Sequence, residues 1–470
     1  MAQSAFKDID NVPLGLQHLK IWFTSGMGFF TDAYDLFIIG IVLILLEGNY
    51  GTSIHISAGN ALVGAGLIGS SAIIAAVIGQ LMWGTLADKF GRKSIYGIEA
   101  TILAVGAILS AFAWNYWSLF AFRFILGIGI GGDYPVSATI MSEYANVKDR
   151  GKLIALVFAN QGIGSLTAVA VGLGSVAALP PELAWRFMLF FGAIPALAVV
   201  YLRKKLPETP RYSAYVLKDK VKAEKAAKFV KPDANISSIN DTRVNNFRAF
   251  ISNYWKMLIV TAGSWFLVDI ALYGAGIFSG PITSQIIPPH SLDQKIVLAG
   301  VPFMIGFLGY FSAVAFIDKL GRKTIQILGF FGMAILYFVV SSELIAKGTK
   351  ITGFMLPVNL MFLLYALTFF FIDFGPNTTT FVIPAEIYPV KFRTTGHGIS
   401  AAAGKAGAAL TTFYFTYLLL QYGLKEVLMG LAIVSLIGGF LSFGLKETKN
   451  TSLEDITEEN QRSSSEGVPS

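Results

Sequence analysis

Gly127-Ile-Gly-Ile-Gly-Gly-Asp-Tyr-Pro135, followed by Val136-Ser-Ala-Thr-Ile-Met-Ser-Glu143, lies in an apolar run from Trp117 to about Met141. This run is long enough to cross the ~30 Å hydrocarbon core of a bilayer as a helix. Its four glycines let another helix or a ligand approach the backbone closely. A carboxylate at the centre of a span costs at least ~2.5 kcal/mol, so Asp133 is expected to face a cavity and mark a transport path. The alternative is that Asp133 only pairs with a basic residue to hold two helices together.

The composition is that of an all-α integral membrane protein. The 470 residues are 54% hydrophobic and only 14% charged, whereas soluble domains are about 25% charged. Residues 1–19 are polar and show no pattern of a cleavable signal peptide. The absence of cysteine excludes disulfides and thiolate metal sites, and neither a metal nor a cofactor is expected. The net charge is +7, and the basic residues lie in loops on one side of the predicted membrane spans. Nucleic acid is therefore not expected as a partner.

Apolar stretches of 18 or more residues predict 12 transmembrane helices. They cover about 20–46, 58–86, 94–113, 117–143, 152–178, 184–202, 256–282, 296–317, 324–345, 354–382, 397–420 and 427–445. Between the sixth and seventh, residues 203–248 hold 12 Lys+Arg against 5 Asp+Glu. We therefore expect two six-helix bundles joined by a linker with helical pieces, and a disordered tail. The four expected units are 1–202, 203–253, 254–446 and 447–470.

Basic residues predict the orientation in the membrane. Lysine and arginine concentrate in the loops after even-numbered spans and in the linker after span six. The loops after odd-numbered spans hold only scattered lysines, namely Lys295, Lys347, Lys350 and Lys425. Cytoplasmic loops carry the excess of positive charge, so both termini and the linker are predicted to be cytoplasmic.

The two halves of the chain repeat each other. Trp83-Gly-Thr-Leu-Ala-Asp-Lys-Phe-Gly-Arg-Lys93 returns as Phe316-Ile-Asp-Lys-Leu-Gly-Arg-Lys323, and Glu143 with Arg150 is echoed by Glu386 with Arg393. In each loop the aspartate is expected to cap the incoming helix and to pair with the arginine, while glycine allows the tight turn. The expected gating residues are Asp88, Gly91, Arg92, Asp318, Gly321 and Arg322. Two parallel repeats of six spans resemble the major facilitator superfamily, whose halves rock around a site near the midplane.

Span one carries Thr31-Asp32-Ala-Tyr34-Asp35, in which two carboxylates share a helix face near mid-membrane. Two carboxylates that close are not both ionised in a low dielectric, so one is expected to hold a proton near neutral pH. That is what a proton-coupled carrier requires. The alternative is that Asp35 only forms an interhelical hydrogen bond. Arg123 in span four is a possible counter-charge for Asp32, Asp35 or Glu99.

Spans five, seven and eleven add further polar groups. Trp265, Asp269 and Tyr273 are spaced by four, so one face presents an indole N–H, a carboxylate and a phenol. This set suits a small, oxygen-rich ligand that carries its own proton. Lys405 must face a cavity or a carboxylate, and Asp269 is its expected partner. Gln161 could serve the ligand or join two helices.

Six segments resemble the phosphate:proton symporters of the major facilitator superfamily. They are Asp-Ala-Tyr-Asp-Leu (32–36), Gly-Gly-Asp-Tyr-Pro-Val-Ser-Ala-Thr-Ile-Met-Ser-Glu (131–143), Ala-Asn-Gln (159–161), Trp-Phe-Leu-Val-Asp-Ile-Ala-Leu-Tyr-Gly (265–274), Gly-Pro-Asn-Thr-Thr-Thr-Phe (375–381) and His-Gly-Ile-Ser-Ala-Ala-Ala-Gly-Lys (397–405). The resemblance implies that phosphate is held by Tyr134, Gln161, Trp265, Asp269, Tyr273 and Asn377. It also implies that protons pass through Asp32, Asp35 and Asp133, assisted by Lys405. Asp373 departs from the family pattern, which has an amide or neutral residue there.

The function expected from this resemblance is import of inorganic phosphate with protons across the plasma membrane by a monomeric carrier. A carrier of another small anion or a sugar is the first alternative, because Pro207-Glu-Thr-Pro-Arg211 also occurs in sugar porters. A phosphate-sensing receptor is the second, although neither linker nor tail contains a recognisable signalling domain. No enzyme activity is expected, since no nucleophile–base pair stands out.

Overall fold

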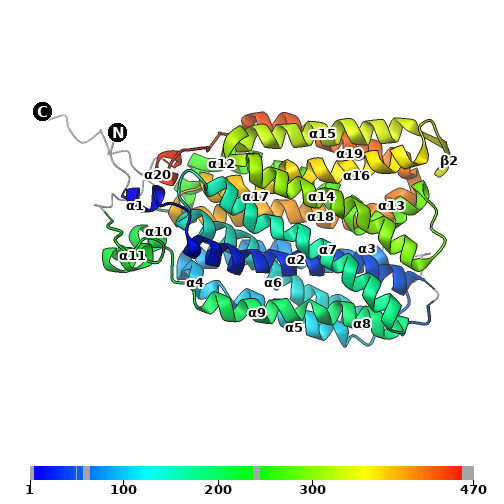
Figure 1. Ribbon diagram of the computed structural model, residues 1–470, viewed down its shortest axis with the longest axis horizontal. Coiled ribbons are helices and arrows are strands. Elements are labelled where there is room, and N and C mark those ends of the chain that lie inside the picture. The colour runs from blue at the N-terminus through cyan, green and yellow to red at the C-terminus, as the bar shows by residue number, and fades with distance from the viewer. Residues whose placement is uncertain (1–4, 49, 57–63, 237–243, 458–470) are drawn as a thin grey trace, which may run out of the picture.

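The computed structural model describes residues 5–48, 50–56, 64–236 and 244–457, and it is almost wholly helical (Figure 1). Long helices run side by side, with the helices before the linker in the lower half of the view and those after it in the upper half. We call these groups, α2 to α9 and α12 to α19, the N-half and the C-half. The short helices α1 (Lys7–Asp10), α10 (Pro210–Tyr215), α11 (Lys220–Ala227) and α20 (Leu453–Ile456) gather at one end, here called the α1/α20 end.

The N-half supplies six spans. They are α2 (Leu16–Glu47), α3 (Ala65–Phe90), α4 (Arg92–Ile95) with α5 (Ile98–Ala111), α6 (Tyr116–Tyr144), α7 (Arg150–Ala178), and α8 (Pro181–Phe191) with α9 (Ala193–Lys204). α6 stays helical through Pro135. Its glycines pack closely against neighbouring helices. A Cβ on Gly131 would lie 2.6 Å from the Gln80 nitrogen of α3, and one on Gly129 would lie 2.6 Å from the Glu99 carbonyl of α5.

The C-half also supplies six spans. They are α12 (Phe247–Ile277), α14 (Leu292–Leu320), α15 (Arg322–Glu343), α16 (Val358–Phe374) with α17 (Pro376–Ile387), α18 (Arg393–Tyr422), and α19 (Leu424–Leu441) with the 3₁₀ turn η2 (Ser442–Gly444). Shorter elements are α13 (Ser279–Ile286) and the 3₁₀ turn η1 (Val390–Phe392). Among the described residues 11 segments are long and apolar enough to cross a membrane, and the more polar α18 is the twelfth long helix of the fold.

Glycine and proline set the breaks between helices, and the turns at Gly91 and Gly321 are those that the sequence predicts. Gly91 and Gly321 have φ angles of 99° and 98°, a region in which a side chain would strain the backbone. They end α3 and α14 and let the next helix start at once. The Gly375-Pro376 pair separates α16 from α17, because proline cannot continue the preceding hydrogen-bond ladder.

Three expectations need correction. α12 begins at Phe247, before the expected boundary at 254, whereas the two linker helices that precede it are the helical pieces that were expected. The tail is not disordered as far as Thr457, because Leu453 and Glu454 of α20 are fully buried; residues 458–470 lie outside the described part. An antiparallel hairpin of β1 (Leu344–Lys347) and β2 (Lys350–Phe354), absent from the sequence-based expectation, marks the opposite end, here called the hairpin end.

Candidate functional site

A chain of hydrogen bonds joins the two halves at mid-bundle. The Tyr134 hydroxyl of α6 accepts from the Gln161 amide of α7 at 2.9 Å, and the Gln161 carbonyl accepts from the Tyr310 hydroxyl of α14 at 3.1 Å. Tyr310 in turn accepts from the Asn377 amide of α17 at 2.7 Å. All four side chains are buried. Three of the residues named from the sequence, Tyr134, Gln161 and Asn377, are thus brought together from three helices.

Lys405 of α18 pairs with Asp269 of α12, at 2.9 Å between Nζ and Oδ2, as the sequence predicts. The ammonium also lies 4.5 Å from the ring centroids of both Tyr134 and Tyr273. Oδ1 of Asp269 and Nε1 of Trp265 are buried and make no hydrogen bond within the described part of the chain. Buried polar atoms normally have partners, so these two mark a place where a polar ligand could bind.

Aromatic rings enclose these polar side chains. We call the group the polar centre; it consists of Tyr134, Gln161, Trp265, Asp269, Tyr273, Tyr310, Asn377 and Lys405. The Phe29 ring lies 5.0 Å from that of Tyr134 and 4.8 Å from that of Phe381. Phe158 stacks on Phe381 at 4.4 Å, and Trp265 lies 6.1 Å from Tyr134. Such walls exclude water and lower the local dielectric, which strengthens every charge interaction inside.

A second polar cluster lies within the N-half. Arg203 of α9 pairs with Asp133 at 2.7 Å and with Glu99 at 2.9 Å. Together with Asp32 they line a cavity of about 10 Å³, room for about one water molecule. Neither carboxylate oxygen of Asp32 has a hydrogen-bond partner among the described residues. Asp133 therefore has both surroundings that the sequence left open, a basic partner and a cavity.

Asp35 and Arg123 form a third buried group. The sequence left Asp32, Asp35 and Glu99 open as the carboxylate for which Arg123 is the counter-charge, and the structure places Arg123 beside Asp35, to whose backbone carbonyl its guanidinium donates at 2.8 Å. The Asp35 carboxylate packs against Gly192, where a Cβ would overlap it, and makes no hydrogen bond within the described ranges. Asp32 and Asp35 therefore have different nearest neighbours, although they are three residues apart.

One ion-pair cluster closes the α1/α20 end around Glu143 of α6. Glu143 pairs with Arg92 at 3.3 Å and with Arg393 of the C-half at 3.0 Å. Asp88 pairs with Arg92 at 3.2 Å, as predicted, and accepts a hydrogen bond from the backbone N–H of Thr395 at 2.7 Å. The cap was expected on the helix that follows Asp88. It lies instead on α18 of the other half.

A second cluster repeats the first with the halves exchanged. Glu386 of α17 pairs with Arg322 at 2.8 Å and with Arg150 of the N-half at 2.8 Å. Asp318 pairs with Arg322 at 2.7 Å, and it accepts from the backbone N–H of Lys152 in the first turn of α7 at 2.8 Å. Each glutamate therefore binds one arginine of its own half and one of the other. These contacts fasten the halves together at this end.

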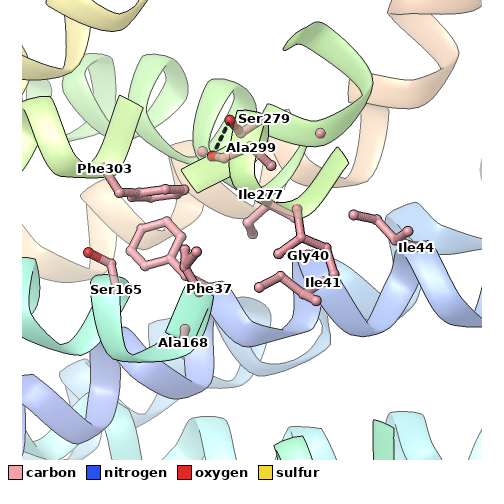
Figure 2. A pocket seen from close by; sticks show the side chains of 14 residues that line it. Phe37, Gly40, Ile41, Ile44, Ser165, Ala168, Ile277, Ser279, Ala299 and Phe303 are labelled. Carbon is pink, nitrogen blue, oxygen red and sulfur yellow. Dashed lines mark hydrogen bonds between the residues drawn. The ribbon is translucent and has the colours of Figure 1, made fainter. Parts of the chain in front are cut away.

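Toward the hairpin end the halves meet through apolar contacts (Figure 2). The rings of Phe37 of α2 and Phe303 of α14 lie 5.0 Å apart. A Cβ on Gly40 would lie 2.6 Å from the carbonyl oxygen of Ile277, so the backbones of α2 and α12 almost touch. The cavity between these residues measures about 20 Å³, room for one or two water molecules. Contacts between the halves thus lie on both sides of the polar centre.

Comparison with known proteins identifies the family. The sequence profile described as "Sugar (and other) transporter" matches residues 22–459. The chain is 38% identical to the "Probable inorganic phosphate transporter 1-6" of Arabidopsis thaliana, with 97% of each chain covered. It is also 38% identical to the "Low affinity inorganic phosphate transporter 3" of Petunia hybrida, over 96% of this chain and 94% of the relative. This chain belongs to the inorganic phosphate transporter family.

Solved structures show the fold of this transporter. A structure of the proton:xylose symporter XylE of the major facilitator superfamily, bound to 6-bromo-6-deoxy-D-glucose, superposes with a TM-score of 0.78. It is 19% identical, and 93% of this chain and 98% of that chain are covered. The protein therefore has the twelve-helix fold of the major facilitator superfamily, in two six-helix bundles.

Two residues of these polar groups, Tyr310 and Arg203, were not predicted from the transporter's sequence. Tyr310 connects Gln161 to Asn377, and a phenol within an apolar span is the signal that could have shown it. Arg203 was assigned to the linker because it follows span six directly. It lies in the last turn of α9 and is buried, and a guanidinium so close to an apolar span was the available signal.

Proposed function

We propose that this transporter imports inorganic phosphate with protons across the plasma membrane by alternating access. The observation that carries the proposal is the polar centre, where Lys405, two tyrosines and the partnerless atoms of Asp269 and Trp265 converge between the halves. The names of the relatives, which are inorganic phosphate transporters, support the substrate. Proton coupling rests on Asp32 and Asp35, buried carboxylates that have no hydrogen-bond partner among the described residues.

In this proposal the centre binds phosphate by complementary hydrogen bonds. The phosphate-binding residues are Tyr134, Gln161, Trp265, Asp269, Tyr273 and Asn377. An ionised Asp269 accepts the P–OH hydrogen bond that phosphate retains at neutral pH, while the phenols, the indole and the amides donate to its other oxygens. Sulfate has no such proton and would set its lone pairs against the carboxylate. A site built for a hydrogen-bonding group can reject an analogue without it by ~10⁴.

The proposed proton carriers are the carboxylates of the N-half. Asp32 and Asp35 are buried without hydrogen-bond partners in the described chain, so an ionised form of either is costly and a proton is readily held. Asp133 is paired with Arg203 and accepts a hydrogen bond from Ser137. Arg123 and Lys405 supply positive charge on either side of the path. Asp32 and Asp133 line the same cavity, so Asp133 is the neighbouring carboxylate to which Asp32 would pass a proton.

Alternating access would work by rocking the two bundles about the centre. The moving units are proposed as residues 1–202 and 254–446, the second extended by the start of α12, with 203–253 and 447–470 on the cytoplasmic side. The gates at the α1/α20 end are the two ion-pair clusters together with the loops that carry them. The loop residues are Asp88, Gly91, Arg92, Asp318, Gly321 and Arg322. This end is assigned to the cytoplasm with both termini, and the working unit is a monomer.

Binding to purified Asp269→Asn tests the proposal. Because a hydrogen bond to a charged group contributes about 1.5–3 kcal/mol, phosphate affinity measured by calorimetry should fall about 10- to 100-fold. The gap between phosphate and sulfate should narrow at the same time. Asp293→Asn, at an exposed position in the first turn of α14, is the matched control and should bind phosphate like the wild type. An Asp269→Asn variant with wild-type phosphate affinity that still excludes sulfate would refute this site.

Counterflow in liposomes identifies the substrate class. Radiolabelled phosphate should exchange, whereas sulfate and glucose should not. Exchange of glucose would establish the sugar carrier instead, an alternative favoured by the family description and by the xylose symporter fold. Phosphate binding without any exchange would instead indicate a receptor.

A further inference from the structure

Asp373 is a buried carboxylate that the proposed coupling path does not use. It lies near the end of α16, just before the break at Gly375-Pro376, and is 4% exposed. Its Oδ1 accepts a hydrogen bond from the Asn377 amide at 2.7 Å. The carboxylate packs on glycines of α14: a Cβ on Gly309 would lie 3.2 Å from that of Asp373, and one on Gly306 would overlap its Oδ2. The fold thus makes room for a carboxyl group at this position.

Among the described residues, no cation compensates Asp373. Its ionisable neighbours are phenols on three packed helices, namely Tyr310 of α14, Tyr337 of α15 and Tyr273 of α12. No ion pair of Asp373 occurs among the described residues, and Lys405 is engaged by Asp269. A buried carboxylate without a counter-ion is costly when ionised, so binding a proton relieves it.

The same carboxylate is connected to the proposed phosphate site. The Asn377 amide donates both to Asp373 and to the Tyr310 hydroxyl, each at 2.7 Å. Tyr310 donates to Gln161, whose amide donates to Tyr134. The chain therefore runs from the C-half, across the interface between the halves, to a tyrosine of the N-half.

We propose that Asp373 is a further proton-binding site of the transporter, linked to the phosphate site through Asn377 and Tyr310. The step is simple: a proton from water adds to the carboxylate to form one O–H bond, and returns to water when that bond breaks. A neutral acid accepts a weaker hydrogen bond than a carboxylate, so protonation frees the Asn377 amide for a phosphate oxygen. Proton and phosphate then favour each other's binding, and this coupling is reciprocal. The role in transport rests on the proposed function, whereas the protonation itself does not.

Infrared spectroscopy during a pH titration tests the proton site directly. The purified wild type should show a carbonyl band of a protonated carboxylic acid that titrates with pH and is missing from Asp373→Asn. Asp293→Asn is the control and should retain the band. Asn377→Leu keeps the carboxyl group but removes the amide that links it to phosphate, so the band should remain while its response to added phosphate is lost. A titrating spectrum that is identical in wild type and Asp373→Asn would overturn the proposal.

The proton-to-phosphate ratio tests the role in transport. In proteoliposomes the ratio follows from the membrane potential at which a fixed pH gradient drives no net phosphate flux. Asp373→Asn should carry one proton fewer per phosphate than the wild type, and Asp373→Glu should restore the wild-type ratio. An unchanged ratio in Asp373→Asn overturns the coupling role. If the wild type itself accumulates no phosphate, the proposed function fails, and the infrared titration still decides whether Asp373 binds a proton.

Discussion

The α1/α20 end and the polar centre handle buried charge in opposite ways. At the end, Glu143 and Glu386 each sit between two arginines, which are Arg150 and Arg322 for Glu386. Arginine cannot lose its proton in a protein, so these pairs are permanent charges. At the centre the cation is Lys405, and its partner Asp269 keeps one oxygen free of hydrogen bonds within the described chain. Lysine and aspartate can both exchange protons, so the centre can change its charge while the end only opens or closes.

Buried charge therefore has two roles in this transporter: it holds the halves together at the α1/α20 end, and it can bind or release protons at the centre. Removing the glutamate from an arginine pair leaves a guanidinium charge that no proton transfer can neutralise. Breaking a pair at the centre leaves a group that can neutralise itself by a proton. The energetic cost of a substitution should therefore depend on which region it touches, even at equal burial.

Glu386→Ala should have the largest effect on stability. It leaves Arg150 and Arg322 buried without their shared carboxylate, and removing one partner from a buried pair costs about 3–5 kcal/mol. The melting temperature of the purified protein should fall strongly. Glu426→Gln, an exposed carboxylate in the first turn of α19, is the control and should melt like the wild type. Equal melting of Glu386→Ala and wild type would mean that the end is not a permanent clamp.

Lys405→Ala should destabilise the fold less than Glu386→Ala does, although the ion pair that it breaks is equally buried. Asp269 can take up a proton in place of the ammonium, which leaves a polar group at a cost of about 1–3 kcal/mol. Phosphate uptake should nevertheless be slow, since the carboxylate then lacks its fixed partner. Melting and uptake measured on the same preparation check this. A stability loss as large as that of Glu386→Ala would contradict the distinction between the two regions.

Glu454→Gln should have a smaller effect that depends on pH. Burial acts to raise the pKa of Glu454, but the Arg211 guanidinium beside it holds that pKa below its usual range. A carboxyl group whose pKa is lowered by folding stabilises the fold at pH values above its unfolded pKa of about 4.3. This stabilisation is lost as the pH falls through the pKa of the folded state. The variant should lose about 1 kcal/mol at neutral pH, because a charged hydrogen bond becomes a neutral one.

The test for Glu454 is a melting series in pH for both proteins. The difference between their melting temperatures should be constant above about pH 5 and should shrink at lower pH. A difference that grows on acidification would show that Glu454 is not held ionised by Arg211.

Gly430→Ala should have the smallest effect and lies outside both regions. Gly430 is an exposed glycine within α19, and a Cβ there would meet nothing within 4 Å. Alanine in a helix is favoured over glycine by about 0.5–1 kcal/mol, so a slight rise in melting temperature is expected. A fall would mean that this open space is used by another group.

Sequence reasoning predicted the parts of the site that depend on local spacing. Trp265, Asp269 and Tyr273 share one helix face because residues four apart always do. The pairing of Asp269 with Lys405 followed from the high cost of either charge alone. The choice among the three carboxylates offered to Arg123 did not follow, because all three were compatible with it, and only the structure shows that the guanidinium lies beside Asp35 and donates to its backbone carbonyl.

The sequence by itself determined the helices, their breaks at Gly375-Pro376 and the doubled loop, because these depend on hydrophobic length and on local backbone geometry. Only the tertiary structure decided which charges of one half meet those of the other at the α1/α20 end. Glu143 and Arg150 lie close in the chain, as do Glu386 and Arg393, yet the halves exchange these arginines in space. The rotation of each helix about its axis and its contact with the other half set such pairs. Neither is a property of a single stretch of chain, since both result from packing all twelve helices at once.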